Sequence, residues 1–302
     1  MLAIVIPYYN LTFFEATLQS LANQTNQQFK VYIGDDASPE NPSGLLEKYQ
    51  AKFDFHYHRF ETNLGGTSLV KQWERCIAIT GNEEWIMILG DDDVLENNCV
   101  AAFYENLKEI EALKLNVIRY ATTKINEVDK TVSAPYFNPK IEKSIDFLFR
   151  KLNGGTRSSL SEFVFRKETM QHIRFKDFPL AWHSDVLAIL EFSNFCSIYS
   201  INESFVFVRS SGINISSRLD NLILKNLATF KYYYYLISNK LTYFDFYQKI
   251  ILYDALEKSF LDNKKNGNYW IKLTRLYFVN YEFRRYFVFL KKVYKSVLKR
   301  RY

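Results

Sequence analysis

Short hydrophobic runs and amphipathic segments alternate along roughly the first 120 residues of the chain. The runs are rich in branched and aromatic residues and have the length of buried strands. Between them, apolar residues recur every three or four positions, which predicts helices with one face on a core. The predicted strands cover residues 2–7, 29–33, 53–59, 85–89 and 116–120. The predicted helices are one capped by Asn10 and three more over residues 45–51, 67–79 and 96–113.

This alternation is typical of repeated βα units, so we expect an α/β domain with a mostly parallel central sheet flanked by helices. Residues 121–166 have an irregular pattern around Gly154 and Gly155, which predicts a long loop region near a binding site. From about Leu219 the chain changes to helical stretches dominated by aromatic residues and lysines. We therefore expect an α/β domain over residues 1–218 and a helical C-terminal extension over residues 219–302.

Positive charge is concentrated at the C-terminal end. The 302 residues are 48% hydrophobic and carry a net charge of +6, which excludes a disordered chain, and residues 282–302 contain eight Lys or Arg and one Glu. Aromatic residues alternate with these cations, which is typical of a helix that lies on anionic lipid. A packed helix with a solvated basic face has the same pattern. No nucleic-acid motif accompanies the cations, so we expect no nucleic-acid partner.

The cysteines and the first residues of the chain indicate the cellular compartment in which we expect the protein. Cys76, Cys99 and Cys196 lie in apolar contexts without a CxxC pair, which predicts buried thiols in a reducing compartment. The N-terminus has no basic leader, and no stretch approaches the ~20 apolar residues of a spanning helix. We therefore expect a cytoplasmic protein. The basic tail adds the hypothesis of a peripheral position at the inner face of the cell membrane.

Three consecutive carboxylates, Asp91, Asp92 and Asp93, follow the apolar run at residues 85–89. Neighbouring carboxylates repel by up to ~4 kcal/mol per pair at ~4 Å and an effective dielectric constant of 20. An oxygen-only set of this kind suits Mg²⁺ or Mn²⁺ that also binds phosphate oxygens. Taken alone, the triplet is equally well explained as a solvated acidic turn or a helix N-terminus.

Two other polar groups follow predicted strands. Asp35 and Asp36 come after the second strand, and Tyr8 and Tyr9 come after the first. A carboxylate there can accept hydrogen bonds from a base N–H or a ribose hydroxyl, and a tyrosine ring can stack on a base. Turn chemistry and core packing are the alternatives. Ligands of open α/β sheets bind at such strand ends.

Four motifs occur in a fixed order: Ile-Pro-Tyr-Tyr-Asn at residues 6–10, Gly-Asp-Asp-Ala-Ser at 34–38, Asn-Leu-Gly-Gly at 63–66, and the Asp triplet. Together they resemble the family 2 glycosyltransferases of the GT-A fold, over roughly the first 215 residues. The resemblance implies an inverting enzyme with Mn²⁺ or Mg²⁺ that takes a sugar from a nucleotide diphosphate, a UDP-sugar being favoured. It also implies a saccharide acceptor and a setting in bacterial surface polysaccharide synthesis. The irregular pattern of residues 121–166 predicts the loop that faces the acceptor, and the basic tail adds the hypothesis of a lipid-linked acceptor.

The resemblance implies a nucleotide pocket made by five residues: Pro7, Tyr9, Asp36, Lys71 and Asp92. Tyr9 would stack on the base and Asp36 would bond to it. Lys71 stands where the family often has an arginine that faces the nucleotide.

The metal motif departs from the family. The family pattern is Asp-x-Asp-Asp, and alignment on Leu89 and Leu95 places Gly90 at the first acid. This frame leaves Asp92 for a ribose or sugar contact and Asp93 as the principal metal ligand. An alternative alignment of the motif makes Asp91 and Asp93 the metal ligands.

The resemblance also places the catalytic base and a phosphate contact. Within the segment Trp-His-Ser-Asp at residues 182–185, Asp185 is the expected base, although a charge at a helix N-terminus explains it too. Residues 206–216 resemble the loop that closes over the diphosphate, with Arg209 as its cation. A structural salt bridge is the alternative for Arg209. The histidine that is common in this loop is absent.

Two other classes of function stay open. The glycine at position 90 also suits a catalytically silent scaffold that binds a sugar nucleotide or a membrane. A phosphotransferase or phosphatase on a doubly wound sheet would gather aspartates at strand ends as well. It would need an Asp nucleophile after the first strand, where Tyr8, Tyr9 and Asn10 stand instead.

Overall fold

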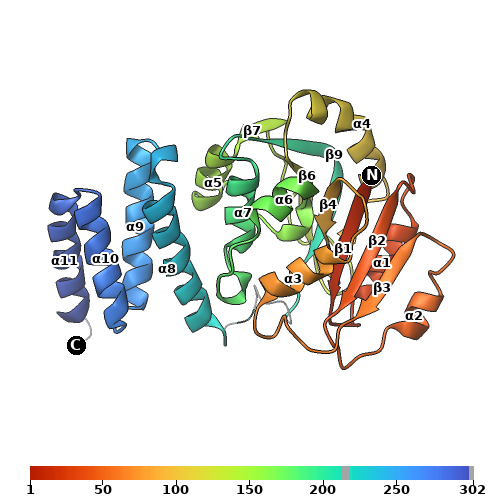
Figure 1. Ribbon diagram of the computed structural model, residues 1–302, viewed down its shortest axis with the longest axis horizontal. Coiled ribbons are helices and arrows are strands. Elements are labelled where there is room, and N and C mark those ends of the chain that lie inside the picture. The colour runs from red at the N-terminus through yellow and green to blue at the C-terminus, as the bar shows by residue number, and fades with distance from the viewer. Residues whose placement is uncertain (213–217, 219, 299–302) are drawn as a thin grey trace. The chain divides into compact units, whose positions relative to one another are not determined.

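The computed structural model describes residues 1–212, 218 and 220–298, which form two compact units (Figure 1). The first unit comprises Met1–Asp177 and Ser184–Arg218 and contains a central sheet with helices around it. The second comprises Phe178–His183 and the helices after residue 220.

The first unit alternates strands and helices for most of its length. The strands are β1 (Leu2–Tyr8), β2 (Phe29–Asp35), β3 (Phe55–Arg59), β4 (Trp85–Ile88), β5 (Val94–Leu95), β6 (Val117–Ile125), β7 (Ile141–Lys143), β8 (Phe163–Arg166) and β9 (Ser197–Arg209). The helices are α1 (Phe14–Ala22), α2 (Ser43–Glu47), α3 (Leu69–Ala78), α4 (Cys99–Ala112), α5 (Ser144–Leu152), α6 (Lys167–Ile173) and α7 (Ser184–Phe192).

The sheet has the order β3-β2-β1-β4-β8-β6-β9-β5, and β7 pairs with β9. Strands β3, β2, β1 and β4 are parallel, whereas β8 runs antiparallel to both of its neighbours. Parallel strands covered on both faces need continuous apolar runs, which is the pattern that the sequence shows here. The predicted α/β sheet flanked by helices is confirmed.

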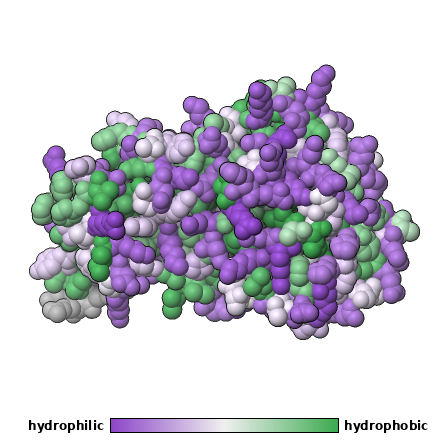
Figure 2. All heavy atoms as spheres, in the orientation of Figure 1, coloured by the Kyte–Doolittle hydropathy of each residue, from purple (hydrophilic) through white to green (hydrophobic). Residues whose placement is uncertain are grey.

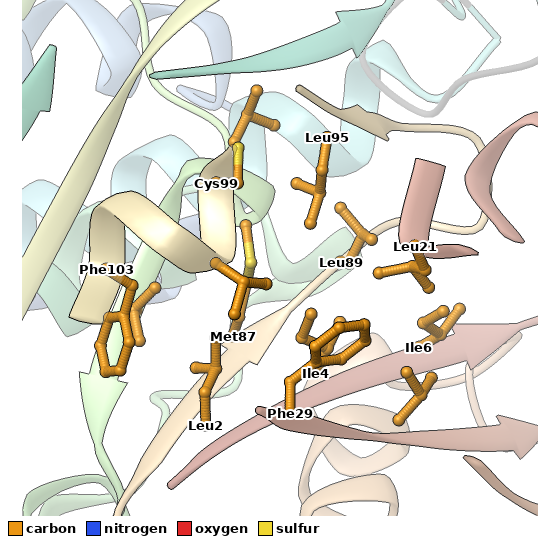
Figure 3. Close-up of a cluster of buried hydrophobic side chains, with 14 of the residues drawn as sticks. Leu2, Ile4, Ile6, Leu21, Phe29, Met87, Leu89, Leu95, Cys99 and Phe103 are labelled. Carbon is orange, nitrogen blue, oxygen red and sulfur yellow. The ribbon is translucent and has the colours of Figure 1, made fainter. Parts of the chain in front are cut away.

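The core of the first unit lies along β1. Leu2, Ile4 and Ile6 belong to a buried cluster with Phe29 of β2 and Met87 of β4 (Figure 3). Each such side chain contributes about 1.5–3 kcal/mol to stability on burial. β1 pairs in parallel with β2 and with β4, so the carboxyl ends of all three strands lie at one edge of the sheet, and the motif loops follow those ends.

Gly34 gives a direct test of this packing. A Cβ atom at Gly34 would lie 2.3 Å from Sγ of Cys76 and 3.1 Å from the ring of Phe60. We therefore expect Gly34→Ala to lower the free energy of unfolding by about 1–3 kcal/mol, measured by urea denaturation. At Gly44 nothing lies within 4 Å of an added Cβ, so Gly44→Ala is the matched control. Equal stability of the two variants would contradict the packing described.

Three predictions from the sequence are wrong in detail. Asn10 does not cap α1: the cap position is Phe13, and the Asn10 side chain accepts a hydrogen bond from the Thr12 N–H instead. Residues 121–166 are not one long loop, because β6 extends to Ile125 and β7, α5 and β8 follow. Cys196 is exposed, unlike the two other cysteines.

The second unit is helical. Its helices are α8 (Leu222–Asn239), α9 (Phe246–Asp262), α10 (Gly267–Val279) and α11 (Phe283–Leu298). Phe230 of α8 stacks on Tyr269 of α10 with ring centroids 3.9 Å apart, and Phe260 of α9 packs edge-on against Phe289 of α11. In the part of the chain that the structure describes, no helix combines the length and hydrophobicity needed to cross a membrane.

A buried carboxylate ties the helices of this unit together. Glu257 of α9 is 2% exposed and accepts hydrogen bonds from Tyr277 Oη at 2.7 Å, Arg285 Nε at 2.9 Å and Lys292 Nζ at 2.6 Å. A buried charge needs such partners to be tolerated. The pairing engages Arg285 and Lys292 of α11, and the side chain of Lys292 stays 43% exposed.

Candidate functional site

The ends of β1, β2 and β4 bring three of the motifs together at one edge of the sheet. Asp91, after β4, accepts hydrogen bonds from the N–H groups of Tyr9 and Asn10, both at 2.8 Å. The N–H of Asp36 donates to the carbonyl of Tyr8 at 3.0 Å. The loops after the three strands are therefore joined directly, as expected for a ligand site of an α/β sheet.

Asp91 holds this edge together. Burial raises the pKa of Asp91 to about 6, and the N–H groups of Asn10 and Tyr9 act in the opposite direction. One carboxylate oxygen is used by the loop after β1. The predicted role of Asp91 as a metal ligand stays a prediction, and its contacts show that it also fixes the position of Tyr9.

Asp92 and Asp93 form the electrostatic centre of the site. Asp93 is 6% exposed, and its Oδ1 accepts from the N–H of Arg209 at 2.8 Å. Burial raises the pKa of Asp93. Burial, followed by the charges of Asp93 and Asp91, raises the pKa of Asp92. Ionising all three acids at one place is costly, so this edge favours an added cation.

Gly90 makes room for the two carboxylates. A Cβ atom at Gly90 would lie 2.9 Å from Oδ1 of Asp92, 3.2 Å from Oδ2 of Asp93 and 3.5 Å from Oγ of Ser161. The N–H of Gly90 donates to Oγ of Ser161 at 3.0 Å. The acids of the motif therefore occupy the space that a side chain at position 90 would need.

The residues fit a divalent ion that binds together with a phosphate group. Among residues 1–212, 218 and 220–298, no group of three His, Cys, Asp or Glu is arranged to hold a metal. Mg²⁺ in phosphate-transfer sites needs only one or two carboxylates and completes its shell with phosphate oxygens and water. The oxygens of Asp92 and Asp93 that converge over Gly90 are such a donor set.

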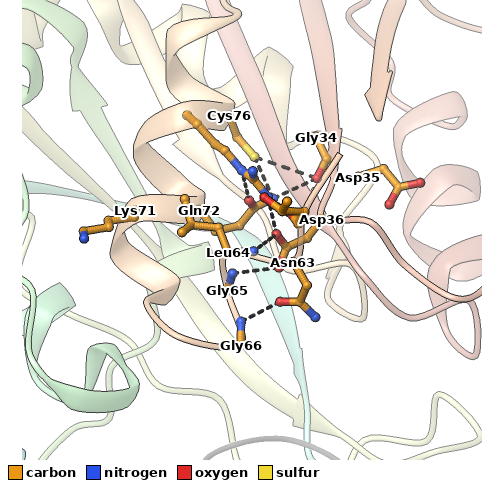
Figure 4. A network of polar contacts seen from close by, with 12 residues as sticks. Gly34, Asp35, Asp36, Asn63, Leu64, Gly65, Gly66, Lys71, Gln72 and Cys76 are labelled. Carbon is orange, nitrogen blue, oxygen red and sulfur yellow. Dashed lines mark hydrogen bonds and ion pairs between the residues drawn. The ribbon is translucent and has the colours of Figure 1, made fainter. Parts of the chain in front are cut away.

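Asp36 lies in a polar network beside this centre (Figure 4). Its carboxylate accepts from the N–H groups of Leu64 at 2.7 Å and Gly65 at 2.8 Å, and it forms an ion pair with Arg75. Lys71 is exposed and points away from the network (Figure 4). The cation beside Asp36 is thus Arg75, one helical turn after Lys71, and the sequence reasoning missed it.

The loop after β2 is fixed from its other side by Asp35. Its carboxylate accepts from Ser38 N at 2.8 Å, Tyr57 Oη at 2.5 Å and Arg59 Nη1 at 2.7 Å. Burial and the bond to Asp35 raise the pKa of Tyr57 to about 12, so the phenol stays protonated as a donor. Asp35 is therefore a structural carboxylate of the loop.

Tyr9 is presented to solvent at the end of β1. Its side chain is 45% exposed, and its carbonyl accepts from Ser38 Oγ at 2.6 Å. Tyr8 is fully buried, and its hydroxyl donates to the carbonyl of Glu40. Pro7 lies opposite Gly34 in the register of β1 and β2. Of the two tyrosines, only Tyr9 has a ring that a base can reach.

Arg209, at the end of β9, is engaged within the protein. Its guanidinium is 1% exposed and donates to the carbonyls of Asp92 at 2.8 Å and Asn126 at 2.7 Å, and to the carboxylate of Asp129. These contacts match the structural alternative for this residue, and its predicted contact with the diphosphate stays a prediction. Residues 213–216 of the predicted closing loop lie outside the described residues.

Asp185 lies in the first turn of α7. Burial raises the pKa of Asp185, while the charge of Lys151, the N–H groups of the helix start and the charge of Arg157 lower it. A raised pKa brings a carboxylate closer to the pH at which a general base is efficient. The position fits both the predicted base and the helix-terminus alternative.

A turn between α5 and β8 adds residues that sequence reasoning missed. This 3₁₀ turn, η1 (Leu160–Glu162), places Ser161 against Gly90 and Glu162 against Arg157. Ser159 and Glu162 form a capping box, and the Ser-x-x-Glu spacing is the signal that could have found the turn.

Comparison with known proteins places this arrangement in a family. The family model described as glycosyl transferase family 2 matches residues 3–170, more than half of the chain. A structure of S. aureus TarS 1–349 in complex with UDP-GlcNAc has a TM-score of 0.65 at 17% identity, covering 88% of this chain and 74% of that one. A structure of GalNAc-T7 with UDP, GalNAc and Mn²⁺ has a TM-score of 0.53 at 10% identity, covering 84% and 54%.

A curated relative extends the match in sequence. The teichoic acid poly(glycerol phosphate) polymerase of Staphylococcus epidermidis is 25% identical over 201 residues, 64% of this chain and 26% of the polymerase. The chain spans between 6% and 36% of the length of the curated relatives it matches. The similarity to the solved structures confirms the predicted GT-A fold. With the family's motifs joined at one sheet edge and its model matched over residues 3–170, the chain belongs to glycosyl transferase family 2.

Proposed function

We propose that the first unit is an inverting glycosyltransferase that uses a nucleotide diphosphate sugar, a UDP-sugar above others, and a hydroxyl acceptor. The observation that carries this proposal is the convergence of Asp92 and Asp93 over Gly90, beside the loop of Asp36. The TarS structure with UDP-GlcNAc supports a uridine nucleotide. The acceptor class, a saccharide or a lipid-linked saccharide, rests on family membership and on the sequence of the polymerase relative.

The donor would bind along the ends of β1, β2 and β4. The exposed ring of Tyr9 offers a stacking surface for the base, and Pro7 shapes the strand end beneath it. Asp36 is held in place by Arg75 and the loop N–H groups, and in this position it would bond to the nucleoside. Lys71 would take part only if its side chain turned toward the network.

Asp93 would hold a divalent ion, with Asp92 beside it for the ribose or sugar. When bound, Mn²⁺ or Mg²⁺ neutralises charge on the leaving diphosphate. The GalNAc-T7 structure with Mn²⁺ supports this kind of ion. Asp93 is already oriented by the N–H of Arg209, so its second oxygen is the one that points over Gly90.

Asp185 would act on the acceptor. Its carboxylate removes the proton of the acceptor hydroxyl while that oxygen attacks the anomeric carbon from the face opposite the diphosphate. The bond from the anomeric carbon to the diphosphate oxygen breaks, and the nucleoside diphosphate leaves with the bonding electrons. The configuration at the anomeric carbon is therefore inverted.

A screen of donor hydrolysis tests the proposal without knowledge of the acceptor. The protein is incubated with a panel of UDP-sugars and other sugar nucleotides, with Mn²⁺ or with EDTA, and free nucleoside diphosphate is measured by mass spectrometry. We expect slow release of UDP from at least one donor, and none in EDTA. Binding of the nucleotide without any release would favour the silent scaffold, and phosphate release alone would favour the phosphotransferase.

A second proposal concerns the membrane. Helix α11 exposes Phe287 at 64% and Tyr294 at 66%, seven positions apart on one face, whereas Phe289 and Val293 pack inward. Figure 2 shows apolar side chains interspersed with hydrophilic ones on the surface of the helices. This pattern, flanked by basic residues, supports peripheral contact with anionic lipid at the inner membrane face. The last predicted cations, Lys299, Arg300 and Arg301, lie outside the described residues.

Vesicle binding tests the membrane proposal through two exposed lysines of α11. Because a lysine near an anionic surface contributes about 1 kcal/mol, Lys291→Ser/Lys295→Ser is expected to weaken binding to vesicles with phosphatidylserine about 30-fold. Exposed lysines of the first unit, replaced in Lys52→Ser/Lys108→Ser, are the matched control. Equal flotation of the two variants would show that α11 packs within its own unit and does not bind lipid.

A further inference from the structure

Arg157 is a cation held beside the acidic centre by a buried carboxylate. Its Nη1 lies 2.9 Å from Oε2 of Glu162, with side-chain exposures of 15% and 2%. Glu162 is held in turn by the N–H of Ser159 at 3.1 Å and by the Ser159 hydroxyl at 3.2 Å. Glu162 therefore acts as an anchor that orients the guanidinium of Arg157.

The turn that carries Glu162 also touches the metal motif. Ser161 accepts from the N–H of Gly90, and its hydroxyl donates to Asp93, which lowers the pKa of that acid. Glu162, which follows Ser161 in this turn, holds the guanidinium of Arg157. Arg157 therefore lies beside the turn that contacts Gly90, and its positive charge also lowers the pKa of Asp185.

Arg209 and Lys71, the two cations predicted from the sequence, are poorly placed for a ligand at this centre. Arg209 is 1% exposed and donates to two carbonyls and Asp129, and Lys71 points away. The charge of Lys151 of α5 lowers the pKa of Asp185. Arg157 uses one nitrogen on Glu162, and its Nε and Nη2 have no hydrogen-bond acceptor among the described residues. A guanidinium fork of this kind suits two phosphate oxygens.

We propose that Arg157 binds the terminal phosphate of the donor diphosphate, beside the turn that contacts Gly90, and that Glu162 is the positioning residue that orients it. This assignment rests on the proposed function and deepens it, because it names a protein cation for the phosphate that departs with the nucleotide. The sugar is attached to that phosphate, so Arg157 lies where charge develops as the bond breaks.

Calorimetry with two nucleotides separates this role from a structural one. UDP carries the terminal phosphate and UMP lacks it, so Arg157→Met is expected to weaken UDP binding about 10- to 100-fold in Mn²⁺ while UMP binding is unchanged. Arg166→Met, which removes an ion pair with Glu111, is the matched control and is expected to change neither affinity. Equal losses for UDP and UMP, or no loss for either, would overturn the assignment.

Two more variants distinguish a loss of phosphate binding from a loss of folding. Arg157→Lys keeps a charge without the fork and is expected to give an intermediate loss of UDP affinity. Glu162→Gln keeps the size of the anchor and is expected to weaken UDP binding less than Arg157→Met does. A wild-type protein that binds UDP no better than UMP in Mn²⁺ would overturn the proposed function itself, and this assignment with it.

Discussion

Asp185→Asn is expected to lower turnover by about 10² to 10⁴-fold and to leave UDP affinity unchanged. The amide keeps the size of the carboxylate but cannot take a proton from the acceptor hydroxyl. The proposed nucleotide contacts come from the ends of β1, β2 and β4, so we expect them to stay intact. Donor hydrolysis gives the rate and calorimetry with UDP and Mn²⁺ gives the affinity.

The helix-terminus alternative for Asp185 has its own control. Asp146 lies in the first turn of α5, as Asp185 does in α7, but it is exposed. Asp146→Asn removes the same favourable interaction with a helix dipole and is expected to leave turnover unchanged. If Asp185→Asn lost stability but kept its turnover, the acid would be a helix charge only.

The pH dependence of turnover follows from the same residue. A base must be ionised to act, and burial raises the pKa of Asp185 above the ordinary value of 3.8. Turnover limited by this group therefore rises with pH through the raised pKa and levels off above it. The charges of Lys151 and Arg157 lower the pKa of Asp185, so removal of either charge raises that pKa. The rise of turnover with pH then moves to higher pH.

Asp93→Ala is expected to abolish the effect of metal on nucleotide binding and to lower turnover about 10²-fold or more, because a metal contributes several kcal/mol of charge stabilisation. In the wild type, Mn²⁺ should strengthen UDP binding, since burial raises the pKa values of Asp92 and Asp93 and a bound cation would favour their charged forms. In the variant, UDP affinity with Mn²⁺ should equal that in EDTA.

Calorimetry in Mn²⁺ and in EDTA checks this prediction. Asp54→Ala removes an exposed acid that pairs with Lys30 on the surface, and it controls for net charge. A variant at Asp93 that kept the full effect of Mn²⁺ would show that another residue holds the ion. Asp91, a metal ligand in the alternative alignment of the motif, would then be the first candidate.

The strands and the place of the site could be predicted because both follow from local patterns. The buried runs that became β1, β2 and β4 are continuous and apolar, and parallel strands must end at one edge. Polar residues directly after these runs therefore had to meet. The contacts of Asp91 with the loop after β1 are the result.

The contacts that failed to follow from the sequence depend on side-chain direction and on distant partners. Lys71 and Arg75 lie four positions apart on α3, and only the packing of α3 on β1 and β2 decides which one meets Asp36. Arg209 is occupied by Asn126 and Asp129, which are more than 75 residues away in the chain.

The turn around Ser161 had no periodic pattern to reveal it. Three residues of 3₁₀ helix are too short for a hydrophobic repeat, so the segment looked like a loop. Its role comes from tertiary contacts with Gly90 and Arg157. Similarly, Phe178–His183 belongs to the helical unit, whereas the residues on both sides belong to the first unit.

Anomalous scattering from crystals grown with UDP and Mn²⁺ locates the bound ion independently of activity, and so shows whether Asp93 is a metal ligand. We expect a manganese peak bonded to the carboxylate of Asp93, with diphosphate oxygens completing its shell and the uracil ring against Tyr9. A nucleotide bound elsewhere, with no manganese beside Asp93, would contradict this expectation.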